Sequence, residues 1–171
     1  VIVKVAPGIY NENLQITRSI TLASHAIDDN LTNWVTNTPF WQVVNPNINN
    51  TIIDGSANPE TTELGSTILI YSDSEDCITP TIKGFTIQNG IGTLVTRNPG
   101  TDYESQERLG GGVLFDIADT TIEYNQFINN GKIINDGITT VTTHAGGAIY
   151  ATNSDEDWDF NNRDNRQSRC T

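Results

Sequence analysis

The chain has 171 residues, and its 21 Asp and Glu against 9 Lys and Arg give a formal net charge of −12. This length suits one domain with a real core. So acidic a chain repels phosphate backbones, which argues against nucleic acid as a partner. No run of about 18 apolar residues occurs, so no membrane span is predicted. The composition, rich in Asn, Thr, Asp and Gly, fits a secreted or cell-surface protein, or simply a solvated acidic surface.

Short segments in which apolar and polar residues alternate recur along the chain, and they are rich in Ile, Val, Thr and aromatic residues. Strands are expected at 1–6, 19–24, 50–56, 66–72, 81–89, 112–117, 120–128 and 147–151. Helical periodicity is nearly absent. Asn-Gly and Asp-Gly, the dipeptides of two-residue hairpins, fall between strands only weakly, at Asn89-Gly90 and Asp54-Gly55. An all-β fold with few tight hairpins is therefore predicted.

Two internal repeats connect these segments. An offset of 36 places residues 110–114 over 146–150, where three small residues precede two apolar ones. An offset of 40 places residues 82–89 over 122–129, so that Ile82 meets Ile122. Repeats of this period indicate a solenoid. Each strand is predicted to pair in parallel with its equivalent one coil above. The chain is therefore expected to continue around a coil after each strand and not to fold back in a hairpin.

The chain resembles right-handed parallel β-helix proteins of the pectin-lyase-like group. The opening stretch VIVKVAPGIYNENLQI looks like a first coil, and TIIDGS, IKGFTIQNG, GGGVLF and GGAIYA look like later coils. The resemblance covers residues 1–161, with interruptions at 27–48 and 91–108, and leaves 162–171 as a polar tail. It implies a parallel β-helix (solenoid) with loop insertions, which we interpret as a truncated or N-terminal portion because the chain opens inside a strand.

The coil model predicts a buried core and a structural role for asparagine. Aligned stacks are expected to bury Ile82, Phe85, Ile87, Val113, Phe115, Ile122, Phe127, Ile149 and Tyr150, with no helix longer than about two turns. Side-chain amides at the junctions of strands and turns are expected to hold the turn backbone, as an asparagine ladder, at Asn89, Asn125, Asn129 and Asn161.

The insertion 27–48 brings Trp34, Phe40 and Trp41 into an otherwise polar segment. Flat aromatic faces stack on pyranose rings, and neighbouring Asn, Asp and Gln supply hydrogen bonds to sugar hydroxyls, so these three residues are candidates for carbohydrate binding. The competing interpretation, which the sequence favours, is that they cover one end of the helix as a cap.

Acidic residues follow the strands that the repeats align. Asp73, Asp76, Asp116, Asp119 and Asp155 are expected to gather on one edge of the stack. Neighbouring carboxylates repel one another unless a cation bridges them, and calcium takes six to eight oxygen ligands. Calcium is therefore the expected cofactor if the edge is a site, and solvated turns are the favoured alternative. No EF-hand or glycine-rich calcium motif is present.

Candidates for catalysis are few. The basic residues of the central coils are Lys83, Arg97, Arg108 and Lys132, and the offset of 40 places Lys83 beside Glu123, where a cross-strand salt bridge is expected. No nucleophile motif or phosphate loop occurs. Cys77 and Cys170 form no metal-ligand spacing, so a disulfide and two separate thiols both remain open, with the thiols favoured.

Three function classes follow. The expected one is a noncatalytic extracellular module, a surface scaffold or an element for carbohydrate binding and adhesion, located in the secreted or cell-surface compartment. One alternative is the N-terminal part of a polysaccharide lyase or another carbohydrate-active enzyme, whose anionic substrate the net charge of −12 disfavours unless calcium bridges the two. The other alternative is a filament subunit whose coil ends stack end to end.

Overall fold

The computed structural model describes residues 1–36, 40–57, 63–72, 76–97, 100–131, 133–135, 140–152 and 170. Strands dominate, as the alternating Ile, Val and Thr segments predict. The helical segments are η1 (His25–Asp28), η2 (Leu31–Asn33), α1 (Pro46–Asn50) and η3 (Gly55–Ala57). None of the described helices is long and apolar enough to cross a membrane.

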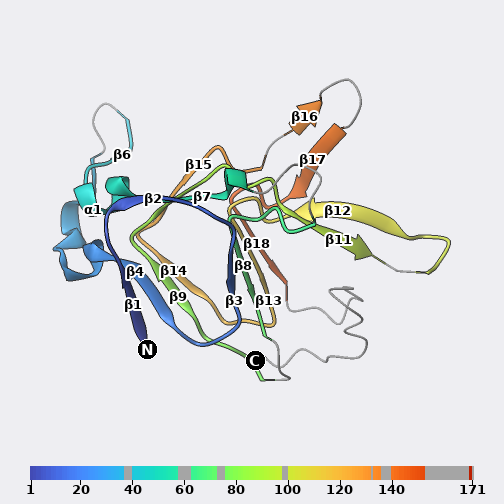
Figure 1. Cartoon of the computed structure of the whole chain (residues 1–171), viewed down its shortest axis with the longest axis horizontal. Helices are drawn as coiled ribbons and strands as arrows, with labels where there is room; N and C mark the ends of the chain where they lie inside the picture. Colours follow the sequence, from blue (N-terminus) through green and yellow to red (C-terminus); the bar gives the residue numbers. More distant parts are fainter. Residues whose placement is uncertain are drawn as a thin grey trace.

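Twelve of the strands form three parallel sheets of four strands each (Figure 1). Sheet A has the order β1 (Ile2–Val5), β4 (Thr21–Ser24), β9 (Thr81–Lys83), β14 (Thr121–Glu123). Sheet B has the order β2 (Gly8–Asn11), β7 (Thr51–Asp54), β10 (Thr86–Gln88), β15 (Gln126–Ile128). Sheet C has the order β3 (Leu14–Ile16), β8 (Ile68–Tyr71), β13 (Val113–Asp116), β18 (Ile149–Thr152).

Along these twelve strands the chain visits sheets A, B and C in turn, four times over. The register matches both repeats of the sequence. The offset of 40 is the pairing of Ile82 with Ile122 and of Ile87 with Phe127. The offset of 36 is the pairing of Val113 with Ile149. Parallel pairing of these segments is therefore confirmed, and the antiparallel hairpin that would contradict it, between 113–117 and 121–128, does not form.

Among the described strands, antiparallel pairing occurs only in the segments that connect the strands of sheets A, B and C. The interruption predicted at 91–108 corresponds to the hairpin of β11 (Thr93–Arg97) and β12 (Ser105–Leu109), which extends one residue beyond it. A further hairpin joins β16 (Ile133–Asn135) to β17 (Thr140–Ala145), and β17 pairs in parallel with β12. Figure 1 shows both hairpins projecting from the same side of the three sheets. The sequence analysis did not anticipate the second one.

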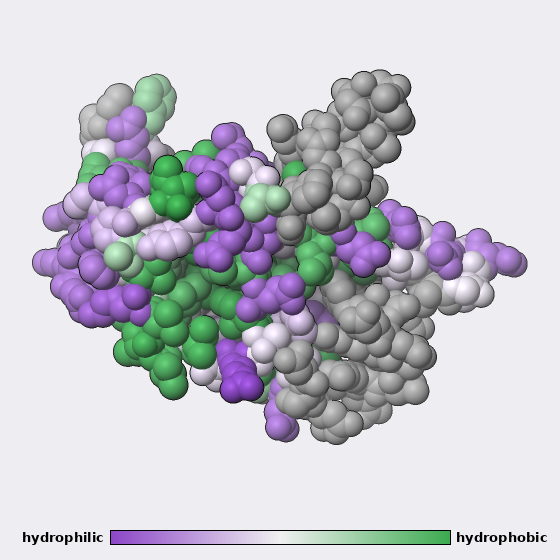
Figure 2. All heavy atoms as spheres, in the orientation of Figure 1, coloured by the Kyte–Doolittle hydropathy of each residue, from purple (hydrophilic) through white to green (hydrophobic). Residues whose placement is uncertain are grey.

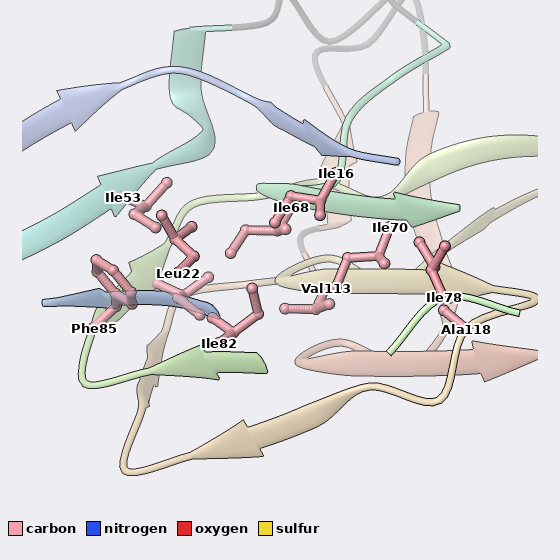
Figure 3. Close-up of a cluster of buried hydrophobic side chains, with 11 residues drawn as sticks. Ile16, Leu22, Ile53, Ile68, Ile70, Ile78, Ile82, Phe85, Val113 and Ala118 are labelled. Atoms are coloured by element: carbon pink, nitrogen blue, oxygen red, sulfur yellow. The ribbon is translucent and has the colours of Figure 1, made fainter. Parts of the chain in front are cut away.

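The core lies between the three sheets (Figure 3). Ile82, Phe85, Ile87 and Val113 are fully buried as predicted, and Phe115, Ile122 and Phe127 are half-buried against the same cluster. Tyr150 packs, half-buried, on a second cluster. The prediction for Ile149 is wrong, because its side chain is 38% exposed. The reason is position, since β18 is the last of the described strands of sheet C, and no further described strand of that sheet covers Ile149.

The repeated glycines lie where the backbones of neighbouring turns approach one another closely. A Cβ atom on Gly111 would clash with the backbone of Gly131 and Gly147, so only glycine fits there.

Asparagine side chains hold the turns through hydrogen bonds. Asn125 accepts a hydrogen bond at Oδ1 from the Phe85 N–H (2.9 Å), and its Nδ2 donates to the Ile82 carbonyl (2.8 Å).

The predicted asparagine ladder is only partly correct. Asn130, not the predicted Asn129, makes the bonds equivalent to those of Asn125, accepting from the Gly90 N–H (3.0 Å) and donating to the Ile87 carbonyl (2.8 Å). Asn89 and Asn129 instead hold left-handed turns, with φ of 62° and 52°. The amides of Asn125 and Asn130 bond to the backbone of the neighbouring turn rather than to an identical amide, whereas the amide of Asn89 donates to the carboxylate of Asp54. Asn161 lies outside the described residues, as does the expected domain boundary at 161.

Cys77 and Cys170 form a disulfide across 93 residues of sequence. The preference for two separate thiols is therefore wrong. Sequence spacing could not decide between them, because a disulfide depends on the distance between the two Cα atoms in the fold, here 5.2 Å.

Candidate carbohydrate-binding site

The aromatic insertion leaves sheet A after β4 and returns to sheet B at β7. It contains η1, η2, a short hairpin of β5 (Val35–Thr36) and β6 (Gln42–Val43), and α1. Each helical segment starts at a residue whose side chain accepts a hydrogen bond from a backbone N–H: Ser24 from Ala26, Asn30 from Thr32, and Asn45 from Ile48. Local capping thus sets the course of the insertion.

Asp29 ties the two halves of the insertion together. Its Oδ2 accepts hydrogen bonds from the Nδ2 atoms of Asn45 and Asn47, each at 2.8 Å. These amide donors, Asn45 first, hold the pKa of Asp29 below its usual value because they stabilise the charged carboxylate. The bonds connect the end of η1 with the start of α1 and so close the insertion at its base.

The insertion is also fixed to the sheet beneath it. Ile48 of α1 is fully buried, and its carbonyl accepts a hydrogen bond from the hydroxyl of Thr86 in β10 (3.0 Å). The hairpin of β5 and β6 therefore rises from a base that is held by buried apolar contact and by polar bonds.

Trp34, directly after η2, packs against a turn of the main sheets. Its ring meets that of Tyr124 edge to face, with centroids 5.6 Å apart and planes at 83°. Tyr124 lies between β14 and β15, and Nζ of Lys83 is 5.1 Å from its ring centroid. Lys83 also forms the salt bridge that was predicted with Glu123, at 3.0 Å. Trp34 is half-buried and held on one side by this group.

Phe40 and Trp41 lie directly before β6 and are 73% and 81% exposed. The expected shielding of Trp41 over one end of the stack is therefore wrong. The physical reason is that the insertion attaches beside the turns between sheets A and B, not over a terminal strand. The structure separates the three predicted aromatic residues into one that packs on the scaffold, Trp34, and two that are presented to solvent. The hairpin of β5 and β6, beside which these two lie, projects at the upper left of the molecule (Figure 1 and Figure 2).

Tyr124 was missed by the sequence analysis. It adopts a left-handed conformation, with φ of 54°, which is unusual for a bulky residue. The offset of 40 sets it over Gly84, whose φ is 80°. A large aromatic residue in place of a turn glycine was the available signal, and the contacts with Trp34 and Lys83 offset the cost of this conformation.

Only part of the predicted edge of aspartates lies within the described residues. Asp73 and Asp155 lie outside the described residues. Asp116 is buried at the end of β13, and Asp76 and Asp119 are exposed. Over the ranges that the structure describes, no group of three or more His, Cys, Asp or Glu side chains is placed to hold a metal ion. The three described aspartates therefore do not form a calcium site by themselves, and calcium binding by the full set of five stays a prediction.

Two of the four basic candidates for catalysis have described side chains, and both form contacts within the fold. Lys83 is paired with Glu123, and Arg108 is buried, with Nη1 donating to the Gly92 carbonyl (2.8 Å). Burial lowers the pKa of Arg108, because it disfavours the charged form. The side chains of Arg97 and Lys132 lie outside the described part of the chain.

No protein-family model matches this chain, and neither do the curated proteins or the solved structures with which it was compared.

Proposed function

We propose that the chain is a noncatalytic, extracellular module built as a right-handed parallel β-helix of the pectin-lyase-like type, and that it binds carbohydrate through Phe40 and Trp41. The three parallel sheets, visited in fixed order, support the fold. The disulfide between Cys77 and Cys170 supports an oxidising compartment outside the cytosol. The observation that carries the binding role is the exposure of two adjacent aromatic side chains on a loop with a fixed base.

Two adjacent exposed aromatic side chains form a contiguous apolar surface, and contiguous apolar surfaces on soluble proteins are typical of interaction sites. A pyranose offers a flat C–H face that stacks on such rings. The net charge of −12 favours neutral or cationic sugars over anionic polymers, since an acidic protein repels uronates and sulfates. The proposed ligand is therefore a neutral oligosaccharide.

Trp34 acts in this proposal as a positioning residue. Its contact with Tyr124 anchors the start of β5, which pairs through Val35 and Thr36 with the strand that follows Trp41. A rigid loop loses less conformational entropy when it binds a ligand, and this raises affinity. Removal of Trp34 is thus expected to weaken binding less than removal of Trp41.

The test is calorimetric titration of the full chain with hexasaccharides of β-1,4-linked glucose, xylose, mannose and N-acetylglucosamine. Trp41→Ala should weaken the best of these by at least about tenfold, the loss of roughly 1.4 kcal/mol of stacking. Tyr103→Ala is the matched control, because Tyr103 is an aromatic residue of similar exposure (83%) between β11 and β12. Equal binding by the wild type and Trp41→Ala, or no binding of any of the four, would refute the site.

The noncatalytic part of the proposal needs its own measurement. The wild type is incubated with polygalacturonate or alginate, with and without calcium, and the absorbance of unsaturated uronate is followed. A flat trace is expected. A steady rise that requires the protein would instead establish the lyase alternative.

A further inference from the structure

The sequence carries, at two places, the pattern Asn-X-Ser/Thr, with X not proline, that accepts N-linked glycans. The two copies are Asn30-Leu31-Thr32 and Asn49-Asn50-Thr51. Such a pattern arises often by chance in a chain rich in Asn and Thr, so the residues alone do not establish a site. The structure distinguishes the two copies, because a glycan is bulky and hydrophilic and requires a surface asparagine.

Within the described part of the chain, the fold uses only the amide oxygen of Asn30. Asn30 and Thr32 are both exposed, at the start of η2. Oδ1 of Asn30 accepts hydrogen bonds from the Thr32 N–H (3.0 Å) and from the Thr32 hydroxyl (2.7 Å). Nδ2 donates no hydrogen bond to any residue that the structure describes. The nitrogen that would carry a sugar is therefore not needed by the fold.

A sugar on Nδ2 would leave the start of η2 intact. An N-linked sugar replaces one hydrogen of the amide nitrogen, whereas the cap of η2 is the amide oxygen. Figure 1 shows α1 and the helical turns that precede it, in blue, outside the three sheets at the left of the molecule, and Figure 2 shows mainly hydrophilic side chains on that side. Asn30 thus lies in surroundings that suit a bulky hydrophilic group.

Asn49 differs in both respects. Its Nδ2 donates a hydrogen bond to the Val43 carbonyl (2.9 Å), which ties α1 to β6. Thr51 is fully buried, and its hydroxyl donates to the Asn47 carbonyl (2.6 Å). An enzyme that recognises the hydroxyl of the pattern cannot reach it once β7 has formed. The second copy of the pattern therefore serves the fold.

We propose that Asn30 is the acceptor of an N-linked glycan and that Asn49 is not. A membrane-bound transferase supplies the oligosaccharide on a lipid pyrophosphate. Nδ2 of Asn30 attacks the anomeric carbon of the first sugar, the bond from that carbon to the phosphate oxygen breaks, and the lipid pyrophosphate leaves with the electron pair. The proton that Nδ2 loses passes to a base of the transferase, and nothing is oxidised or reduced.

This inference rests on the extracellular compartment of the proposed function and not on its carbohydrate binding. The disulfide between Cys77 and Cys170 is typical of a chain that passes through an oxidising compartment, and the acceptor pattern is used in secreted proteins.

The experiment is secretion of the full chain from cultured eukaryotic cells behind a cleavable signal peptide, with mass measurement before and after treatment with a peptide N-glycosidase. The wild type should carry one glycan. The enzyme converts a glycan-bearing asparagine to aspartate, so in heavy-oxygen water it should label Asn30 and leave Asn49 unlabelled. An unmodified Asn30, or a label on Asn49, would overturn the proposal.

Four variants locate the modification. Asn30→Asp keeps an oxygen that caps η2 and removes the acceptor nitrogen, so it should be secreted like the wild type but without glycan. Thr32→Val should also lose the glycan and Thr32→Ser should retain it, because the pattern needs a hydroxyl. Asn49→Gln is the matched control and should keep the single glycan. A glycan that persists in Asn30→Asp would contradict the assignment.

The outcome is independent of the proposed binding site. The signal peptide sends every variant through the secretory route, so an absent glycan counts against Asn30 alone. Carbohydrate binding by Trp41 is measured separately, by calorimetry.

Discussion

At the scale of single residues, side-chain amides hold the turns between sheets A and B and at the end of sheet B. Asn125 and Asn130 each satisfy one backbone N–H and one carbonyl of the neighbouring turn. The distinction from Asn129 is conformational, because a residue with left-handed φ directs its side chain elsewhere. The internal repeat in the sequence identifies the Asn-rich turn, but it does not show which of the two adjacent asparagines faces inward.

Replacing Asn125 tests this role. Asn125→Ala leaves the Phe85 N–H and the Ile82 carbonyl without their partner, so the free energy of unfolding should fall by about 2 to 4 kcal/mol. Urea denaturation measures it. Asn129→Gly is the control, because glycine accepts φ of 52° and the side chain is exposed, and it should change stability by less than about 0.5 kcal/mol. Equal losses in both variants would contradict the bonding seen for Asn125.

At the scale of elements, a buried carboxylate links adjacent strands of sheet B. Asp54 at the end of β7 accepts hydrogen bonds from Gln88 Nε2 (2.7 Å), from Asn89 Nδ2 (3.0 Å) and from the Ser56 N–H (3.0 Å). Burial raises the pKa of Asp54, but these donors outweigh burial and hold the pKa below its usual value. The charged form therefore joins β7, β10 and the turn after each.

This predicts acid sensitivity. A carboxylate whose pKa is lower in the folded state stabilises the fold above its unfolded pKa of about 3.9, and that contribution is lost as pH falls through the folded value. The free energy of unfolding should thus decline more steeply below about pH 4 in the wild type than in Asp54→Asn. Denaturation at several pH values measures both slopes. Asp102→Asn makes the same change on an exposed loop and should keep the wild-type slope; equal slopes in all three would contradict the role of Asp54.

At the scale of the whole molecule, the disulfide joins a residue between β8 and β9 to the far end of the chain. A crosslink over 93 residues removes much of the freedom of the unfolded chain. Cys77→Ser should lower the free energy of unfolding by about 2 to 4 kcal/mol.

The matched experiment uses three variants and a reductant. Cys170→Ser and the double variant should be destabilised as much as Cys77→Ser, since the bond needs both sulfurs. Reductant should bring the wild type down to the same stability and leave the variants unchanged. A stability of the wild type that does not respond to reductant would contradict the crosslink.

The sequence by itself determined where most strands of the three parallel sheets lie, how the repeated ones pair and which residues fill the middle of the core, but it did not predict the strands of the hairpins. Period-two alternation and the offsets of 36 and 40 carry that information, because stacked equivalent strands must place like residues over one another. Only the tertiary structure decided the exposure of Ile149, the partner of Cys77, the packing of Trp34 on Tyr124 and the presentation of Trp41. These features depend on which strand lies at the edge of a sheet and on the path of the insertions that have no repeat. Contacts between segments that are remote in the sequence produce no periodic pattern in it, so the sequence could not predict them.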